Sequence, residues 1–228
     1  MPLINSGFLI DTDFRNSSAK WKAVKPKKEN FMKLILLTAA LLATSAASAE
    51  TYTIDTEKSH IDWKAGKKIG SFHNGKIQIK NGKVETDKKG QVSKAEIAVD
   101  MSTITNEDLK DSPEYQTKLV GHLSSEDFFH VEKYPESTFK LKSIKLKPGS
   151  KDQYLVKGDL TMIGVTKPVE FPAEISADKN KLEGSATLTI ERLKWGLKYG
   201  SGSIFKSLTA DKIINDSFEL KLNLVAKK

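Results

Sequence analysis

The sequence contains no cysteine, and this absence limits what the chain can do. Disulfide bonds, thiolate metal sites and thiol catalysis are excluded, so the hydrophobic core has to stabilise the fold by itself. A lipid-modified N-terminal cysteine is excluded for the same reason. The sequence also lacks an apolar run of about twenty residues, the length that a membrane-spanning helix requires. We therefore expect no stable insertion into a membrane.

The sequence motifs of the common enzyme classes are missing as well. There is no G-x-S-x-G nucleophile elbow, no phosphate-binding loop and no dinucleotide fingerprint. The spacing of the four histidines does not match the close ligand pairs of zinc sites, so we expect no metal. These histidines are His60, His73, His122 and His130. The sequence does not indicate an enzyme.

Arginine is scarce: beyond residue 49 the only one is Arg192, against twenty-nine lysines. A single arginine in such a chain suggests a need for the planar guanidinium group. It could bind the polar head of a ligand, or it could clamp Asp127 or Glu191 structurally, which we favour. The lysines are scattered, and residues 50–228 have a net charge of +4, half that of the whole sequence. A scattered excess of lysine indicates solvated outer faces and not a surface that binds nucleic acid.

The first fifty residues have the features of an export signal. Lys33 precedes the apolar run 34–43, and Ala47-Ser48-Ala49 is a small-residue cleavage site. We expect residues 32–49 to be a secretory signal peptide and residues 1–31 to be a disordered extension from a mispredicted start codon. Cleavage near Ala49 would release residues 50–228, a single domain, into the periplasm or the medium.

Beyond residue 50 the dominant hydrophobic period is two, as in Ile77/Ile79, Ile97/Val99 and the run Phe218/Leu220/Leu222/Leu224. This period is typical of antiparallel strands with one buried face. About eight to ten such strands predict a sandwich or a barrel. Asn74-Gly75 and Asn81-Gly82 are predicted turns, the second a tight hairpin. Alternation alone leaves open whether a barrel interior is filled or hollow.

Two stretches interrupt the period: residues 105–129, which tolerate a helix, and residues 201–215. The segment 121–140 combines a turn, capped by Ser124 or Ser125, with the paired aromatics Phe128 and Phe129. Its residue chemistry fits a lid over an apolar interior, or a connection packed against the core.

Four segments, in order, resemble the YceI-like family of secreted polyisoprenoid-binding proteins. They are Tyr52-Thr53-Ile54-Asp55, residues 100–106 (DMSTITN), residues 122–129 (HLSSEDFF) with Tyr134-Pro135, and residues 158–169 (GDLTMIGVTKPV). The resemblance covers essentially all of residues 50–228. Ser59-His60 and Val120-Gly121 depart from the family pattern and indicate a divergent branch.

The resemblance implies an all-β fold: a lipocalin-like, extended antiparallel β-barrel with an apolar tunnel and short helical excursions. In the family the tunnel holds an isoprenoid tail, so the lid becomes the better interpretation of segment 121–140. The expected function is a periplasmic carrier of an amphiphilic lipid of isoprenoid or fatty-acyl type, with no other cofactor. A solid-core interaction module of the envelope is one alternative, and a weak hydrolase using His122 and a nearby serine is another. A homodimer is left open.

The predicted site residues form two sets. Those expected on the tunnel wall or its lids are Trp63, Phe72, Tyr115, Leu119, Phe128, Phe129, Phe139, Leu141, Met162, Trp195 and Phe205. Those expected at the polar head, or as structural clamps, are His122, Asp127 and Arg192.

Overall fold

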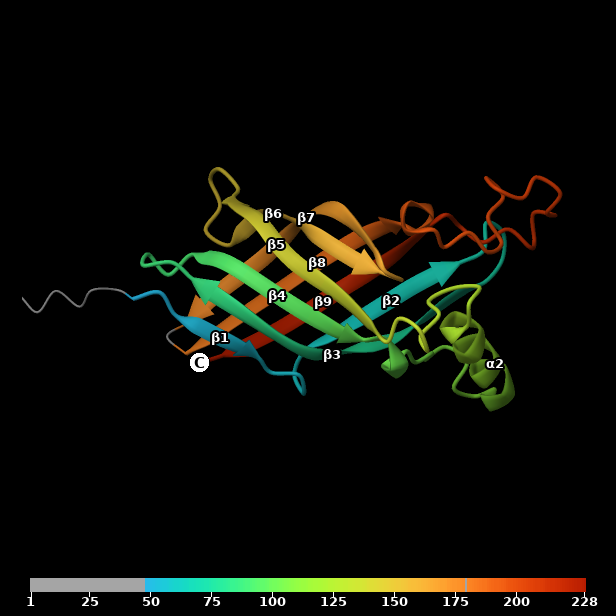
Figure 1. The fold of residues 1–228 in the computed structure, drawn as a ribbon, viewed down its shortest axis with the longest axis horizontal. Helices are drawn as coiled ribbons and strands as arrows, with labels where there is room; N and C mark the ends of the chain where they lie inside the picture. Colours follow the sequence, from blue (N-terminus) through green and yellow to red (C-terminus); the bar gives the residue numbers. More distant parts are fainter. Residues whose placement is uncertain (1–47, 179) are drawn as a thin grey trace, which may run out of the picture. The chain divides into compact units, whose positions relative to one another are not determined.

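Nine strands form the body of the described part of the chain, residues 48–178 and 180–228 of this computed structural model (Figure 1). They are β1 Thr51–Ile54, β2 His60–Gly66, β3 Phe72–Thr86, β4 Val92–Asp100, β5 Glu136–Leu146, β6 Gln153–Met162, β7 Val165–Asp178, β8 Lys181–Glu191 and β9 Ser217–Lys227. Helix α2 Pro113–Ser124 and the 3-10 helices η2 Met101–Thr103 and η3 Arg192–Trp195 lie between strands. The predicted extension 1–31 and nearly all of the predicted signal peptide fall outside the described residues.

The strands form one antiparallel sheet that closes into a barrel, which confirms the predicted fold class. From β3 to β9 each strand pairs with the next along the chain, and β2 joins β3 to β9. Strand β1 occupies the same position in the wall, between β3 and β9, at another level of the barrel, and it pairs with both of these strands. One position in the wall is therefore shared by two short strands, and at any level the barrel has eight strands.

The break between β1 and β2 is sealed by a serine. The Ser59 hydroxyl accepts a hydrogen bond from the Val225 amide at 2.9 Å and lies 3.2 Å from the Val225 carbonyl oxygen, to which it can donate. The side chain thus takes the place of the backbone groups that are missing at the break, and Ser59 is buried. Without this hydroxyl, the Val225 amide would lose its partner in the barrel wall, whereas the Val225 carbonyl would keep the hydrogen bond from the Asp55 amide at 2.8 Å.

Inward-facing side chains pack into two clusters, as the alternating pattern predicts. One is built on β1 to β4 and includes Tyr52, Ile79 and Ile97. The other is built on β6 to β8 with η3 and includes Phe171 and Ile190. Phe129, Leu220 and Leu222 pack against both clusters, so the clusters meet inside the barrel.

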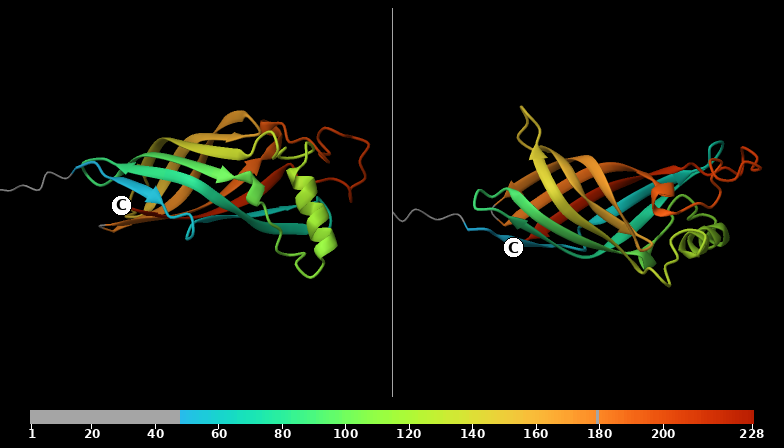
Figure 2. Two further views of the ribbon diagram at one scale, coloured as in Figure 1. Left: turned by 60° about the horizontal axis from the view of Figure 1, so that its bottom comes forward. Right: turned by 45° about the horizontal axis from the view of Figure 1, so that its top comes forward.

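Two pairs of neighbouring strands separate along part of their length. β4 and β5 pair only over residues 96–100 and 136–140, so residues 92–95 and 141–146 form an unpaired seam. β7 and β8 pair only over residues 173–178 and 181–186, and they separate toward the opposite end of the barrel (Figure 2). There η3 contacts β7, and the Trp195 indole donates a hydrogen bond to the Leu160 carbonyl at 3.0 Å. The second separation is therefore filled.

The two predicted Asn-Gly turns are wrong, because both lie inside the fifteen-residue strand β3. Just before Asn81-Gly82, between Ile79 and Asn81, the register with β4 shifts, and a Cβ on Gly82 would lie 2.8 Å from the Ile54 side chain. A Cβ on Gly75 would lie 1.9 Å from the Thr105 carbonyl oxygen. In both places the glycine permits a close approach of another segment and does not reverse the chain.

The predicted excursions lie at one end of the barrel. Residues 105–129 contain α2, and residues 201–215 have no helix. Ser125 follows α2, and its hydroxyl donates to the His122 carbonyl at 2.8 Å and accepts from the Asp127 amide at 3.3 Å, as the capping prediction anticipated. Within the described residues no helix is both long and apolar enough to span a bilayer.

Candidate ligand cavity

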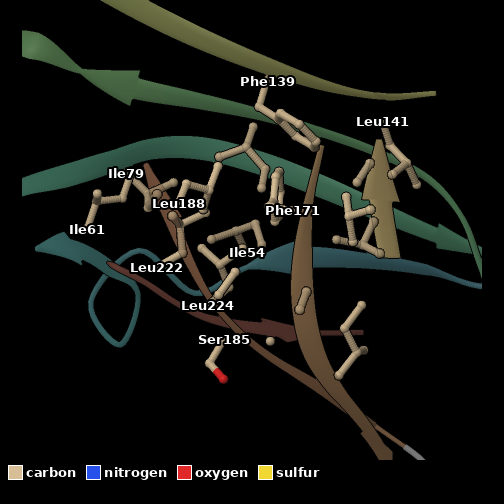
Figure 3. A pocket seen from close by; sticks show the side chains of 18 of the residues that line it. Ile54, Ile61, Ile79, Phe139, Leu141, Phe171, Ser185, Leu188, Leu222 and Leu224 are labelled. Carbon is tan, nitrogen blue, oxygen red and sulfur yellow. The ribbon is translucent and has the colours of Figure 1, made fainter. Parts of the chain in front are cut away.

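The barrel encloses an apolar cavity of about 150 Å³ to which all nine strands contribute lining residues (Figure 3). Isoleucine, leucine, valine and phenylalanine side chains form most of its wall, among them Ile79, Phe171 and Leu222. Three polar residues, Thr138, Glu183 and Ser185, also border it. Figure 3 shows the Ser185 hydroxyl pointing away from the apolar side chains. The interior therefore gives a ligand apolar contact and almost no hydrogen-bonding partner.

The cavity lies in the half of the barrel away from α2, and side-chain size explains why. In this half, inward positions carry small residues, namely Ala95, Ala173, Gly184 and Ala186. In the half next to α2 the inward positions carry large residues that are almost fully buried, namely Trp63, Met162, Ile190 and Trp195. Small side chains leave space that large ones fill, so the α2 end is packed and the other end is hollow.

Of the predicted wall residues, Phe139 and Leu141 line the cavity. Phe139 lies over Gly158 of β6, where a Cβ would come within 2.4 Å of its ring, and it contacts Phe171 with a centroid distance of 5.8 Å. Leu141 comes from one edge of the seam, and Val92 and Ala95 come from the other edge. The seam between β4 and β5 therefore borders the cavity directly.

The other predicted wall and lid residues lie elsewhere. Trp63, Met162 and Trp195 belong to the packed end, and Phe129 packs against both core clusters. Phe72, Tyr115 and Phe205 are exposed, and Leu119 and Phe128 are half-buried. The structure does not bring these nine residues to the cavity wall, and ligand contact by any of them stays a prediction.

Sequence reasoning missed most of the actual wall, which includes a row of aliphatic residues on β8 and β9. Leu188, Leu220, Leu222 and Leu224 were known only as alternating strand positions. The available signal was the small inward pair Gly184 and Ala186, which leaves the space that a ligand needs. The prediction looked for aromatics instead, and most of those fill the packed end or lie on the surface.

The segment after α2 is held by a small aromatic cluster on the outside of the packed end. His122 contacts Phe128 and Tyr199 edge-on, at centroid distances of 5.0 and 4.6 Å. Its Nε2 lies 3.1 Å from Asp127 Oδ2, as a structural clamp requires. Because Tyr199 lies just before the second excursion, residues 201–215, this cluster joins the neighbourhoods of the two excursions.

The arrangement around His122 does not supply a serine nucleophile. The Ser125 hydroxyl donates to the backbone carbonyl of His122, and the imidazole is engaged by Asp127. In the described part of the chain, no hydrogen bond joins the His122 ring to a serine, and no group of three or more potential metal-ligating residues occurs.

Arg192 is a structural clamp within the barrel end, but its partners differ from the two predicted. Its side chain is buried and donates to the carbonyl oxygens of Leu197, Asn215 and Ile214 at 2.6, 2.8 and 3.2 Å. Its carboxylate partner is Asp216, at 3.4 Å, and neither Asp127 nor Glu191. Burial lowers the pKa of Arg192 and the Asp216 charge opposes this, so the guanidinium stays protonated.

Asp216 gives this clamp a pH dependence. Burial alone would raise the pKa of its carboxyl, but hydrogen bonds from Ser201 and Ser203 and the charge of Arg192 hold it below the ordinary value. A carboxyl with a lowered pKa stabilises the fold above its unfolded pKa of about 4, and this contribution is lost as the pH falls through the folded pKa.

We therefore expect Asp216→Asn to lower the free energy of unfolding by about 1 to 2 kcal/mol at neutral pH, because an amide replaces a charged acceptor. The difference from wild type should shrink below about pH 4, where the wild-type carboxyl also becomes neutral. Urea unfolding across this pH range measures both effects. The exposed residue Asp111 provides the control, since Asp111→Asn should change stability little. A difference that persists unchanged at low pH would contradict the assignment.

The fold and the cavity together define a lipocalin-like β-barrel. The chain belongs to the YceI-like family, because the model of the YceI-like domain matches residues 52–226.

Curated relatives support the same assignment. A UPF0312 protein of Pseudomonas putida is 36% identical over 193 residues, covering 81% of this chain and 94% of its own length. One from Pseudomonas syringae is 31% identical over 187 residues, covering 78% and 91%.

Two solved structures share the fold. BcnA of Burkholderia cenocepacia aligns with a TM-score of 0.59 at 23% identity, covering 76% of this chain and 99% of its own. A polyisoprenoid binding domain from Saccharophagus degradans, implicated in plant cell wall breakdown, aligns with a TM-score of 0.55 at 14% identity, covering 77% and 97%.

Proposed function

We propose that this protein carries an amphiphilic lipid, of isoprenoid or fatty-acyl type, with the apolar tail inside the barrel cavity. The observation that carries this proposal is the cavity of about 150 Å³ with an almost entirely apolar wall. Membership of the YceI-like family supports it, and so does the polyisoprenoid binding named for the Saccharophagus domain. The solid-core alternative has no support from an interior that holds a cavity of this kind.

The energetics of such a site need no specific polar contact. Each buried CH₂ group contributes about 0.8 kcal/mol, so a tail with six buried carbons gains about 5 kcal/mol from burial alone. A cavity of this size holds a molecule such as benzene. A longer tail therefore has to displace flexible wall side chains or extend out through the seam, and Leu141 and Ile144 at the seam are only half-buried.

The same wall determines where the polar head lies. A charged or hydroxyl-bearing head inside the cavity would lose its hydrogen bonds to water and find almost no replacement. The head then belongs at the seam or at the hairpin end of the barrel. Arg192, an earlier candidate for head binding, is already engaged by three carbonyl oxygens and Asp216.

Export completes the proposal, and it rests on the predicted signal peptide 32–49. The carrier would then act in the periplasm or outside the cell. Recovery of the protein from a periplasmic extract with an N-terminus at Glu50 would support this location.

Organic extraction of protein purified without detergent, followed by mass spectrometry, tests the carrier function. We expect one amphiphile in near-stoichiometric amount. Protein that arrives empty should bind cis-parinaric acid, with a rise in its fluorescence, and release it to geranylgeraniol. Empty protein that binds neither molecule would overturn the proposal.

A further inference from the structure

Charge is distributed unevenly between the two ends of the barrel. Residues 100–136, which contain η2, α2 and the segment after it, carry nine carboxylates and three lysines. The rest of residues 50–228 therefore has a net charge of +10. Figure 1 shows α2 at one end of the barrel and the β3–β4, β5–β6 and β7–β8 hairpins at the other. The α2 end is acidic.

The hairpin end is basic because two of its hairpins carry more lysines than acids, five against Asp87 and Asp152. The β3–β4 and β5–β6 hairpins carry five lysines, none of which forms an ion pair within the described residues: Lys88, Lys89, Lys145, Lys147 and Lys151. Asp87 accepts hydrogen bonds from the amides of Lys89 and Gln91, and Asp152 accepts one from Ser150. The neighbouring strand β7 adds two carboxylates near this end, Glu174 opposite Gln153 and Asp178 opposite Lys181.

Other lysines near this end are neutralised. Lys94 pairs with Glu85 at 3.1 Å, Lys228 pairs with Glu50 at 2.8 Å, and Lys181 pairs with Glu183. At this end of the described barrel, the lysines without an ion pair therefore lie mainly on the two hairpins that flank the β4–β5 seam. Lys67, Lys68, Lys206 and Lys212, at the α2 end, form no ion pair within the described residues either.

Exposed leucines accompany these lysines. Leu146 is 48% exposed and Leu155 is 37% exposed, and both belong to the hairpin of β5 and β6. This hairpin extends away from the barrel axis (Figure 2). Leu155 pairs with Lys145 and Leu146 pairs with Tyr154, so the two leucines lie on opposite faces of the hairpin. A hairpin that enters an anionic lipid surface by its tip would place its lysines against headgroups and both leucines at the acyl boundary.

The seam gives this surface access to the cavity. The unpaired edges, residues 92–95 of β4 and 141–146 of β5, begin at the two hairpins. Val92 and Ala95 on one edge and Leu141 and Ile144 on the other line the cavity. An apolar tail could thus pass between the strands without crossing the packed end.

We propose that the β3–β4 and β5–β6 hairpins dock the barrel onto an anionic lipid bilayer surface, with the seam facing the lipid. The acidic α2 end then points away from the bilayer. Entry of the lipid through the seam rests on the proposed carrier function. Docking of the hairpins onto the bilayer does not depend on that function.

A second exposed apolar surface competes with the hairpins, and it lies at the α2 end. The β2–β3 loop carries Lys67, Lys68 and Ile69, and it is joined to residues 198–215 by a hydrogen bond from the Lys68 amide to the Ile213 carbonyl at 2.8 Å. The exposed side chains of this surface are Ile69, Phe72, Ile204 and Phe205, with Lys206 and Lys212 nearby. We call it the arm. Because the arm shares its end with the acidic residues 100–136, anionic lipid favours the hairpins.

Charge-reversal variants separate the two surfaces. The hairpin variant carries Lys88→Glu, Lys89→Glu, Lys147→Glu and Lys151→Glu. The arm variant carries Lys67→Glu, Lys68→Glu, Lys206→Glu and Lys212→Glu, so both variants have the same net charge. Binding is measured by cosedimentation at low ionic strength, with vesicles of phosphatidylglycerol and phosphatidylcholine or of phosphatidylcholine alone.

We expect wild type to bind only the anionic vesicles and to be released by salt. The hairpin variant should bind about 100-fold more weakly or worse, since each lysine near such a surface contributes about fivefold. The arm variant should lose much less. Equal losses of vesicle binding in the two variants would mean attraction through net charge alone. A loss of binding only in the arm variant would place docking on the arm. No binding by wild type would remove the proposal. Each of these three results overturns it.

Single labelled cysteines provide a second measurement that leaves the charges intact. Because the chain has no cysteine, Leu146→Cys and Phe205→Cys each accept one environment-sensitive NBD label. Anionic vesicles should raise the emission of the label at position 146 and leave that at 205 unchanged, and the reverse pattern would contradict docking by the hairpins. Parinaric acid binding by both charge variants tests the carrier function separately. Loss of parinaric acid binding in a protein that still docks on anionic vesicles would overturn only the carrier function.

Discussion

Replacing Ala186 with phenylalanine should abolish ligand binding and leave the barrel folded. Ala186 lines the cavity from β8, where it pairs with Leu222 of β9 and Ala173 of β7. A cavity of about 150 Å³ accepts one benzene-sized molecule, so the new phenyl ring would occupy most of the space. We expect parinaric acid to bind at least about 100-fold more weakly, and the melting temperature to stay the same or rise because a void is filled.

The neighbouring residue provides a matched control. Thr187 lies on the same strand and is exposed, because successive side chains of a strand point to opposite faces. Thr187→Phe adds the same ring on the outside and should leave binding unchanged. If both variants bind like wild type, the ligand does not use this cavity. If Ala186→Phe unfolds the protein, the smaller change Ala186→Leu repeats the test with less crowding.

Replacing Arg192 with lysine should destabilise the protein by about 3 kcal/mol, with normal ligand affinity in the molecules that remain folded. The guanidinium donates to three carbonyl oxygens and contacts Asp216 from a buried position. A lysine keeps the charge but has neither the reach nor the fork geometry to satisfy this set, so buried carbonyls lose their partners. Urea unfolding at neutral pH measures the loss.

Lys194, two residues away in η3, is the control for charge at this place. It is exposed and pairs with Glu191 at 2.9 Å, so Lys194→Ala should change stability by less than about 1 kcal/mol. Unchanged stability together with weakened binding in Arg192→Lys would reverse our interpretation and make Arg192 a ligand contact.

The sequence predicts the strands because the information for them is local, whereas the closed barrel was implied by the resemblance to the YceI-like family. A hydrophobic period of two identifies each strand without knowledge of its partner, and the strands of the structure follow that period. The Asn-Gly pairs of β3 mislead because the sequence alone does not distinguish a glycine that allows close approach of another segment from a glycine in a turn. Only the neighbours, Ile54 and Thr105, distinguish the two cases, and they come from other segments.

The candidate site could be predicted only in part, for a related reason. The scarcity of arginine pointed to a clamp at Arg192, but its partner Asp216 lies twenty-four residues further along. Phe139 and Leu141 were placed on the wall by their strand period. The position of the cavity depends on which layer of the barrel has small side chains, and that follows from the register between strands.

The wall position shared by β1 and β2 has a consequence for the timing of folding. Both strands pair with β9, the last strand of the barrel, and the pair Glu50–Lys228 joins residues from its two extremes. Closure therefore requires contacts between the first and last parts of the domain, which are slow to form. Until β9 has left the ribosome the barrel cannot close, so the domain completes its fold only after nearly all of it has been synthesised.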